Sequence, residues 1–335
     1  MKIAPRKAIL ITALIAATLA VAYFLIIKES EPRIYRIGII IDNDIFLPNI
    51  EGFKSKIKEL GYEEGNVEYV LKNVKSQPDL YVRFSKELVD SRPDLIISGS
   101  NIATRELKKL TTSIPIVFLD IGIPAGLIEN VREPEANITG VTGGGVEFVG
   151  KRLELLKEAA PGIKKVIISP DINFPNYPLF IKNLSEASGK LGVEIVEIPS
   201  KNIKDFILRS ETIISKKNGD AFIFFSGPNN ALNDTEDRKR IVDLLKKEKL
   251  PSITHNMELA ANQGILIGYG VYRGDVGREA AILADRVLKG TPIKSLPIIS
   301  PLKSLVLEVN LETAKEIGVV FPEGFLLRVN KIYRE

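Results

Sequence analysis

Cysteine is absent from this 335-residue chain, and histidine occurs only once, as His255. The first absence excludes disulfides, thiolate catalysis and cysteine-bound metals. A histidine-based zinc site or a serine–histidine–aspartate triad would depend on His255 alone, which we interpret as a polar residue at the end of a predicted strand. Because the sequence also lacks a paired nucleophile and base, a metal-binding cluster and a cofactor loop, we predict no enzyme activity, no metal and no cofactor.

A concentrated stripe of positive charge is missing as well. The chain has 46 Lys and Arg residues against 42 Asp and Glu residues, a net charge of +4, and both signs are mixed along the predicted helices. This distribution is typical of a solvated surface and differs from the basic footprint of a nucleic-acid-binding protein. We therefore predict no nucleic-acid partner.

Two glycine-containing stretches fall short of nucleotide-binding motifs. Residues 145–152 read GVEFVGKR and end in Arg where a phosphate-binding loop has Ser or Thr. We interpret this stretch as an amphipathic helix with Lys151 and Arg152 on its outer face. Residues 140–146, GVTGGGV, lack the G-x-G-x-x-G spacing, and we predict a flexible hinge there.

One long uncharged run is present, at residues 8–27, with basic residues before it. About 20 apolar residues span a bilayer as a helix, and preceding positive charges place the start of the run inside the cell. Residues 1–28 are therefore either an uncleaved membrane anchor, which we favour, or a signal peptide cleaved near Ala22. Both interpretations place the rest of the chain outside the cytoplasm, after a short linker at residues 29–34.

The chain contains the same pattern twice. Its first half has continuous apolar strands, IGIIID, PDLIISGS and IPIVFLD, separated by charged helices. About 130 residues later the pattern returns as KKVIISPD, GDAFIFFSGP and LPSITHN. Apolar strands alternating with helices predict parallel sheets covered on both faces. We therefore predict an α/β fold with two similar lobes and a cleft between them.

The predicted lobes do not follow each other simply along the chain. We assign residues 35–139 and about 268–297 to the first lobe, and residues 140–267 and about 298–335 to the second. The region after Ile265 is too short to form a third core, so we expect it to cross back between the lobes. Several crossings make a hinge, which supports closure around a ligand.

Small polar residues follow several predicted strands, where open α/β sheets bind ligands near the amino termini of helices. Asp42 or Asp44 could pair with an ammonium group, and Tyr269 could supply an apolar wall to the site. Helix capping, or core packing for the tyrosine, is the alternative for each residue taken singly. The predicted ligand-binding residues are Asp42, Asn43, Asp44, Ser98, Ser100, Asn101, Thr104, Asn173, Ser226, Asn229, Asn256 and Tyr269.

Several longer phrases resemble a known family. They are ANITGVT, GKRLELLKEAAPGIKKV, GREAAILADRVLKG, LPIISP and the carboxy-terminal LEVNLETAKEIGVVFPEGFLLRV. Together they are similar to the extracytoplasmic substrate-binding proteins of ABC transporters, in the branch with members that bind tryptophan or tyrosine. The resemblance covers nearly all of residues 35–334. It implies a hinged, periplasmic-binding-protein-like fold, a small solute such as an amino acid, and a permease with its ATPase as partners.

Two other functions stay open on the residues alone. One is a membrane-tethered ectodomain that senses a ligand and acts on a partner protein. The absence of a predicted cytoplasmic domain counts against a self-contained sensor. The other is an extracytoplasmic enzyme, which is the weakest alternative because the sequence offers no catalytic constellation.

Overall fold

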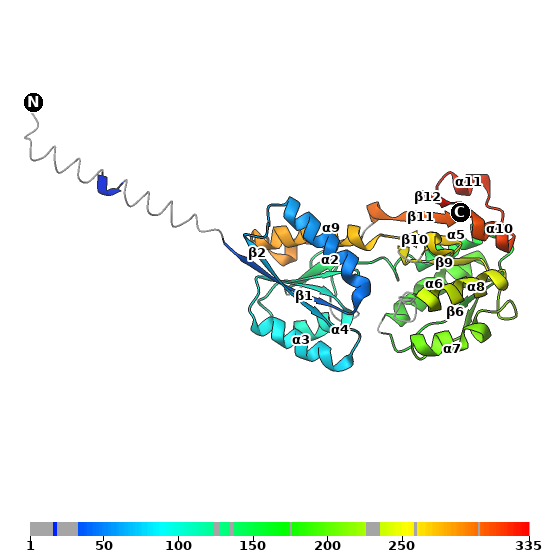
Figure 1. Ribbon diagram of the computed structural model, residues 1–335, viewed down its shortest axis with the longest axis horizontal. Coiled ribbons are helices and arrows are strands. Elements are labelled where there is room, and N and C mark those ends of the chain that lie inside the picture. The colour runs from blue at the N-terminus through cyan, green and yellow to red at the C-terminus, as the bar shows by residue number, and fades with distance from the viewer. Residues whose placement is uncertain are drawn as a thin grey trace, which may run out of the picture.

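The computed structural model describes residues 16–18, 33–122, 128–134, 137–174, 176–225, 235–257, 260–300 and 302–334. Two sheets, each with helices on both faces, form two lobes that lie side by side (Figure 1). We call them lobe 1, with the five-stranded sheet, and lobe 2, with the seven-stranded sheet. The predicted two-lobe α/β fold is confirmed.

Lobe 1 has an all-parallel sheet in the order β2-β1-β3-β4-β5. Its strands are β1 (Tyr35–Ile41), β2 (Val67–Asn73), β3 (Leu95–Gly99), β4 (Ile116–Leu119) and β5 (Ile138–Val141). The helices around it are α2 (Leu47–Glu59), α3 (Pro78–Asp90), α4 (Asn101–Leu110) and α9 (Arg273–Leu288). One buried cluster joins the sheet to α2 and α9, and a second joins it to α3 and α4, so the central strands are covered on both faces.

Lobe 2 has the strand order β12-β11-β10-β9-β8-β6-β7, in which only β10 and β11 pair antiparallel. Its strands are β6 (Lys165–Ile168), β7 (Glu194–Glu197), β8 (Ala221–Ile223), β9 (Ser252–Thr254), β10 (Ile267–Gly270), β11 (Val306–Asn310) and β12 (Lys331–Tyr333). Its helices are α5 (Val149–Ala159), α6 (Tyr177–Leu191), α7 (Ile203–Ile213), α8 (Thr235–Lys247), α10 (Leu311–Ile317) and α11 (Glu323–Leu326). Helices α5 and α6 join one core cluster, and α7 and α8 join another.

The predicted repeat is present in the topology. The order β2-β1-β3-β4-β5 in lobe 1 is reproduced by β7-β6-β8-β9-β10 in lobe 2. The helix after the fifth strand of each repeat crosses to the other lobe: α5 follows β5 and packs on α6, whereas α9 follows β10 and packs on α2. Each lobe is thus completed by a helix from the other repeat. The lobe boundaries stay a prediction, although β10, at residues 267–270, belongs to the sheet of lobe 2.

The α2–α9 pair packs backbone against backbone. A Cβ atom added at Gly277 would lie 1.9 Å from the carbonyl oxygen of Asn49, and one added at Gly52 would lie 2.0 Å from that of Gly274. The side-chain amide of Asn49 donates a 3.0 Å hydrogen bond to the carbonyl oxygen of Arg273. Glycine is therefore required where these two helices cross.

The α5–α6 pair repeats this arrangement with more space. A Cβ atom added at Gly150 would lie 3.2 Å from the Cβ of Ala187 and 3.3 Å from the carbonyl oxygen of Asn183. The amide of Asn183 donates a 3.2 Å hydrogen bond to the carbonyl oxygen of Val146. Asn183, Val146 and Gly150 thus correspond to Asn49, Arg273 and Gly277 of the other pair.

The uncharged run at residues 8–27 lies outside the described residues, apart from residues 16–18. Within the part of the chain that the structure describes, we find no helix with the length and apolar character needed to cross a membrane. The predicted anchor and the predicted cleavage near Ala22 therefore stay predictions.

Candidate functional site

The carboxyl ends of the two sheets adjoin at the junction of the lobes. Asp120 directly follows β4 in lobe 1, and Asn256 follows β9 in lobe 2. Arg273, the first residue of α9, contacts both: its Nε lies 3.0 Å from Asp120 Oδ2, and its Nη1 donates a 2.9 Å hydrogen bond to Asn256 Oδ1. Ligands of open α/β sheets bind at such strand ends, so this junction is the candidate site.

Asp42 joins the ends of β1 and β3 through its carboxylate. Its Oδ1 accepts hydrogen bonds from the hydroxyls of Tyr81 and Ser100, and its Oδ2 accepts bonds from Asn43 Nδ2 at 3.0 Å and Ser76 Oγ at 3.1 Å. Burial, together with the charge of Asp42, raises the pKa of Tyr81. Asp42 thus holds the loop in place, and a ligand ammonium would have to share this carboxylate.

Several predicted residues of lobe 1 have structural partners. Asn43 caps the short helix η1 (Asp44–Phe46) by accepting from the backbone N–H of Ile45 at 3.0 Å. Ser100 caps α4 by accepting from the N–H of Ala103 at 3.3 Å. The exposed Asp44 accepts a hydrogen bond from Asn73. The bonds of Asn43 and Ser100 are the helix caps that the alternative interpretation predicts.

Ser98 and Thr104 are fully buried, and their hydroxyl oxygens lie 2.8 Å apart. Asn101, the first residue of α4, differs from them. Its Oδ1 is buried and has no hydrogen-bond partner within the described chain. Of the predicted residues in lobe 1, Asn101 is therefore the one that presents an unused acceptor.

Asn256 presents an unused donor in lobe 2. It is 2% exposed, its Oδ1 accepts from Arg273, and its Nδ2 has no hydrogen-bond partner in the described part of the structure. Tyr269 lies partly buried in β10 against the core of lobe 2, and Asn173 lies in an exposed turn, with its N–H bonded to Asp171. Ser226 and Asn229 lie outside the described residues.

Arg152 is buried, and the prediction that it lies on the outer face of its helix is wrong. Its guanidinium donates to the carbonyl oxygens of Gly144 and Gly145 and, at 3.3 Å, to that of Tyr269. Burial lowers the pKa of Arg152, while Tyr269 and the nearby Glu147 oppose this change. Arg152 thus ties the crossing between β5 and α5 to β10.

His255 directly follows β9, as predicted, and is close enough to two buried arginines for their charges to affect it. Burial, followed by the positive charges of Arg152 and Arg273, lowers the pKa of His255 well below its usual value. The imidazole is therefore neutral at pH 7.

Asp120 and Arg273 were absent from the predicted site. The available signal for Asp120 was its position at the end of IPIVFLD, which matches that of Asp42 at the end of IGIIID. Its backbone φ of +53° is unusual for a residue other than glycine. Arg273 gave no local signal, because its partners come from distant parts of the chain.

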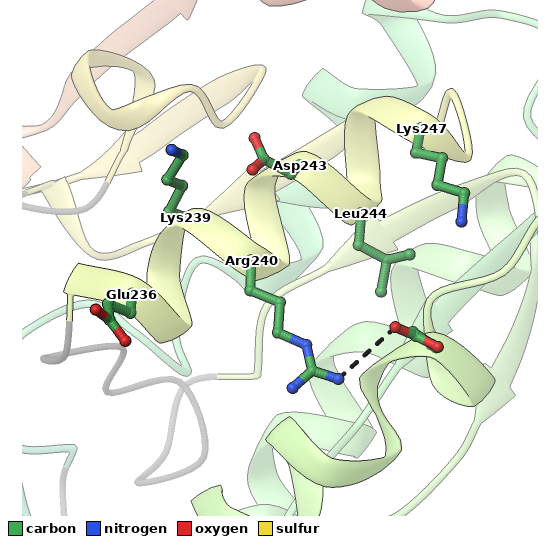
Figure 2. A pocket seen from close by; sticks show the side chains of 7 residues that line it. Glu236, Lys239, Arg240, Asp243, Leu244 and Lys247 are labelled. Carbon is green, nitrogen blue, oxygen red and sulfur yellow. Dashed lines mark ion pairs between the residues drawn. The ribbon is translucent and has the colours of Figure 1, made fainter.

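An open groove of about 420 Å³ lies between α7 and α8 on the outside of lobe 2 (Figure 2). It is lined by Glu211, Glu236, Lys239, Arg240, Asp243, Leu244 and Lys247. The ion pair within it, Arg240 to Glu211 at 3.7 Å, is exposed, and charges of both signs alternate along the groove. Mixed, solvated charges of this kind are typical of an ordinary surface, so we do not assign the site to this groove.

Metal-ligating side chains are not clustered in the described ranges: no group of three or more His, Cys, Asp or Glu residues is placed to hold an ion.

Comparisons with known proteins extend over most of the chain. The family model described as ABC transporter substrate binding protein matches residues 36–332. A tyrosine-binding protein of Clostridioides difficile (strain R20291) is 23% identical over 274 residues, covering 80% of this chain and 76% of that protein.

Two solved structures show the same fold. An ABC domain from Streptococcus pneumoniae in complex with L-Trp has a TM-score of 0.78 and 19% identity, covering 89% of this chain and 99% of that one. A conserved domain protein from Vibrio cholerae O1 biovar eltor has a TM-score of 0.77 and 22% identity, covering 90% and 100%.

Proposed function

Because the chain belongs to the ABC transporter substrate-binding protein family, we propose that it captures a small solute between its lobes and delivers it to a membrane permease. The family implies a small-molecule ligand, an ABC transporter as partner and a location outside the cytoplasm. We further propose that residues 8–27 tether the lobes to the outer face of the membrane, which their apolar length supports.

The proposed ligand is an amino acid, with an aromatic one as the first candidate. A relative is named a tyrosine-binding protein, and a solved structure of the same fold holds L-Trp, which supports this class. Both statements concern those proteins. In this chain, the support comes from the polar atoms at the lobe junction.

The observation that supports the proposal is that each lobe has an unused hydrogen-bonding atom close after the end of a strand. Asn101 Oδ1 in lobe 1 is a buried acceptor and Asn256 Nδ2 in lobe 2 is a buried donor, and neither has a partner among the described residues. Each such group costs about 1–3 kcal/mol when it stays unpaired. An amino acid carries an ammonium donor and a carboxylate acceptor, which match in kind an unused acceptor and an unused donor.

A thermal-shift screen followed by calorimetry tests the proposal. We expect aromatic amino acids to raise the melting temperature, because a ligand that binds only the folded state stabilises it. Sugars serve as the negative panel. If neither aromatic nor branched amino acids shift the melting temperature, the amino-acid assignment is wrong. The intact mass of protein from the membrane fraction shows whether residues 8–27 are retained.

The site is tested by Asn101→Ala, which we expect to weaken ligand affinity about tenfold through loss of the acceptor. Asn202→Ala is the matched control, because Asn202 also stands at the start of a helix but caps α7 on the exposed surface of lobe 2. The control should bind like the unmodified protein. Equal affinity of both variants would show that the site lies elsewhere.

A further inference from the structure

Arg273 is fixed to lobe 1 through its backbone. It begins α9, whose buried side chains, such as Val276 and Ala280, complete the core of lobe 1. The buried Asn49 donates its amide to the carbonyl oxygen of Arg273 at 3.0 Å. The side chain of Arg273 therefore starts from a position that α2 holds firmly.

The guanidinium of Arg273 reaches one group from each lobe. It pairs with Asp120 of lobe 1 at 3.0 Å and donates to Asn256 of lobe 2 at 2.9 Å. The side chains of Arg273 and Asp120 are only 11% and 12% exposed, so water and salt screen this pair weakly. The planar fork of an arginine can hold two such partners in one fixed geometry.

The same contacts touch the segments that cross between the lobes. A Cβ atom added at Gly143 would lie 2.2 Å from Asp120 Oδ1, so the carboxylate rests against the crossing that leads to α5. Tyr272, the residue before Arg273, donates its hydroxyl to the buried Glu308 of lobe 2. Two of the crossings are thus held at or next to Arg273.

We propose that Arg273 is a positioning residue that clasps the two lobes, with Asp120 orienting its guanidinium and Asn256 receiving it. The clasp sets how far apart the lobes stand before ligand arrives. It rests on the proposed function in that lobe movement serves ligand capture, but its test needs no ligand.

The absence of cysteine makes the lobe separation directly measurable. Val82 on α3 and Leu208 on α7 are 56% and 79% exposed, and both helices lie along the lower side of the view in Figure 1. The double variant Val82→Cys, Leu208→Cys accepts two spin labels at these positions and at no others. The distance distribution between the labels then reports the separation of the lobes.

Asn256→Ala removes the acceptor in lobe 2 and leaves the Arg273–Asp120 pair in place. We expect it to shift the label distances to longer values and to broaden their distribution in the ligand-free protein. Arg273→Gln should do the same. If Arg273→Gln does not fold, Asn256→Ala alone carries the test.

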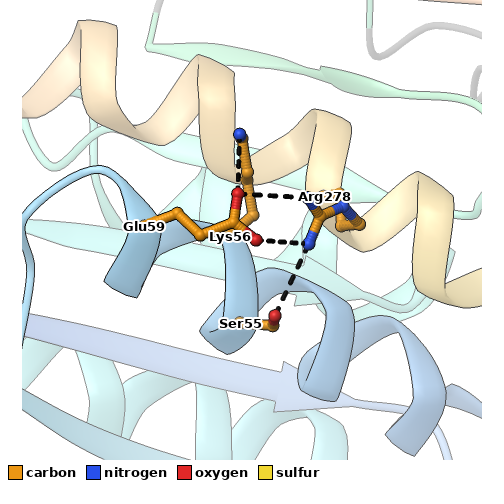
Figure 3. Close-up of polar contacts among 4 residues, drawn as sticks. All are labelled: Ser55, Lys56, Glu59 and Arg278. Atoms are coloured by element: carbon orange, nitrogen blue, oxygen red, sulfur yellow. Dashed lines mark hydrogen bonds and ion pairs between the residues drawn. The ribbon is translucent and has the colours of Figure 1, made fainter.

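The matched control is Arg278→Gln. Arg278 lies on the same helix, but its ion pair is with Glu59 at 2.8 Å, within lobe 1 (Figure 3). This control should leave the distances unchanged. The clasp is wrong if Asn256→Ala also leaves them unchanged, or if Arg278→Gln shifts them equally. If Asn256→Ala shifts the distances but the unmodified protein binds no amino acid, the clasp is kept and the ligand assignment is rejected. If the unmodified protein binds an amino acid but Asn256→Ala does not shift the distances, only the clasp is rejected.

Discussion

Helices α9 and α5 each cross to the other lobe and pack there on a partner helix, but the α2–α9 pair packs more closely than the α5–α6 pair. In the α2–α9 pair, a Cβ atom added at Gly277 would lie 1.9 Å from a backbone oxygen of α2. In the α5–α6 pair, a Cβ atom added at Gly150 would lie 3.2 Å from its nearest neighbour, which is a side-chain Cβ. The closer pair fixes α9, and with it Arg273, rigidly to lobe 1. The looser pair holds the start of α5 less tightly to lobe 2.

The largest expected effect comes from filling the closer crossing. Gly277→Ala places a methyl group against the backbone of α2, which must then move away from α9. We expect the free energy of unfolding in urea to fall by about 3 kcal/mol or more.

Two variants sharpen this test. Gly274→Ala lies on the same helix with its nearest atom at 3.8 Å, and Gly150→Ala lies in the looser pair. Each should stay within about 1 kcal/mol of the unmodified protein, because the better helix propensity of Ala offsets any crowding. If Gly277→Ala were no more destabilising than Gly274→Ala, the two crossings would not differ as described.

The next effect compares the asparagines that hold the starts of the exchanged helices. Asn49 is fully buried, so Asn49→Ala removes the side-chain hydrogen bond to the carbonyl oxygen of Arg273, and we expect a loss of about 1–3 kcal/mol. Asn183→Ala removes a longer, partly exposed bond and should cost less than about 1 kcal/mol. Denaturant titration of both variants measures the difference. Equal losses would contradict the inference that α9 is the more firmly held helix.

The smallest effect concerns the residue after the fourth strand of each repeat, which is Asp120 in lobe 1 and His255 in lobe 2. Since the pKa of His255 is lowered on folding, the unfolded chain binds a proton first as the pH falls below about 6.5. Stability should therefore decrease from pH 7 toward pH 5.5, by at most about 1.4 kcal/mol per pH unit.

The variant His255→Gln has no imidazole and should flatten this dependence. Because the chain has one histidine, other groups that change their charge in this range are few. Unfolding curves at pH 7.5, 6.5 and 5.5 measure the slope. If the free energy of unfolding depends on pH in the variant as it does in the unmodified protein, the dependence comes from carboxylates and not from His255.

The fold was predictable because its signals are local. Helices are predicted from the sequence over residues 149–159 and 235–247, and α5 and α8 have these bounds; the strands are the predicted apolar runs. Helices are also predicted over residues 52–60 and 81–90, but α2 and α3 begin earlier, at Leu47 and Pro78, because each has a proline in its first turn, where the missing N–H is not needed.

The site was less predictable because its contacts are long-range. Helical periodicity placed Arg152 outside, since a charged side chain is normally solvated, but inside the protein its guanidinium donates to three carbonyl oxygens. One of them belongs to Tyr269, 117 residues away. Arg273 likewise depends on groups from both lobes. The polar residues after β1 and β3 were named from the sequence and stay a prediction as ligand-binding residues, whereas the arginines that join the lobes were not named.

The exchange of helices also decides when each lobe can fold during export. Lobe 1 contains the first strands to emerge, yet part of its core is supplied by Val276, Ala280, Leu283 and Val287 of α9. Because the residues of lobe 1 cross the membrane before α9 does, the core of lobe 1 stays incomplete at least until residue 288 has followed. The first half of the chain therefore lacks part of its buried core for most of its passage across the membrane.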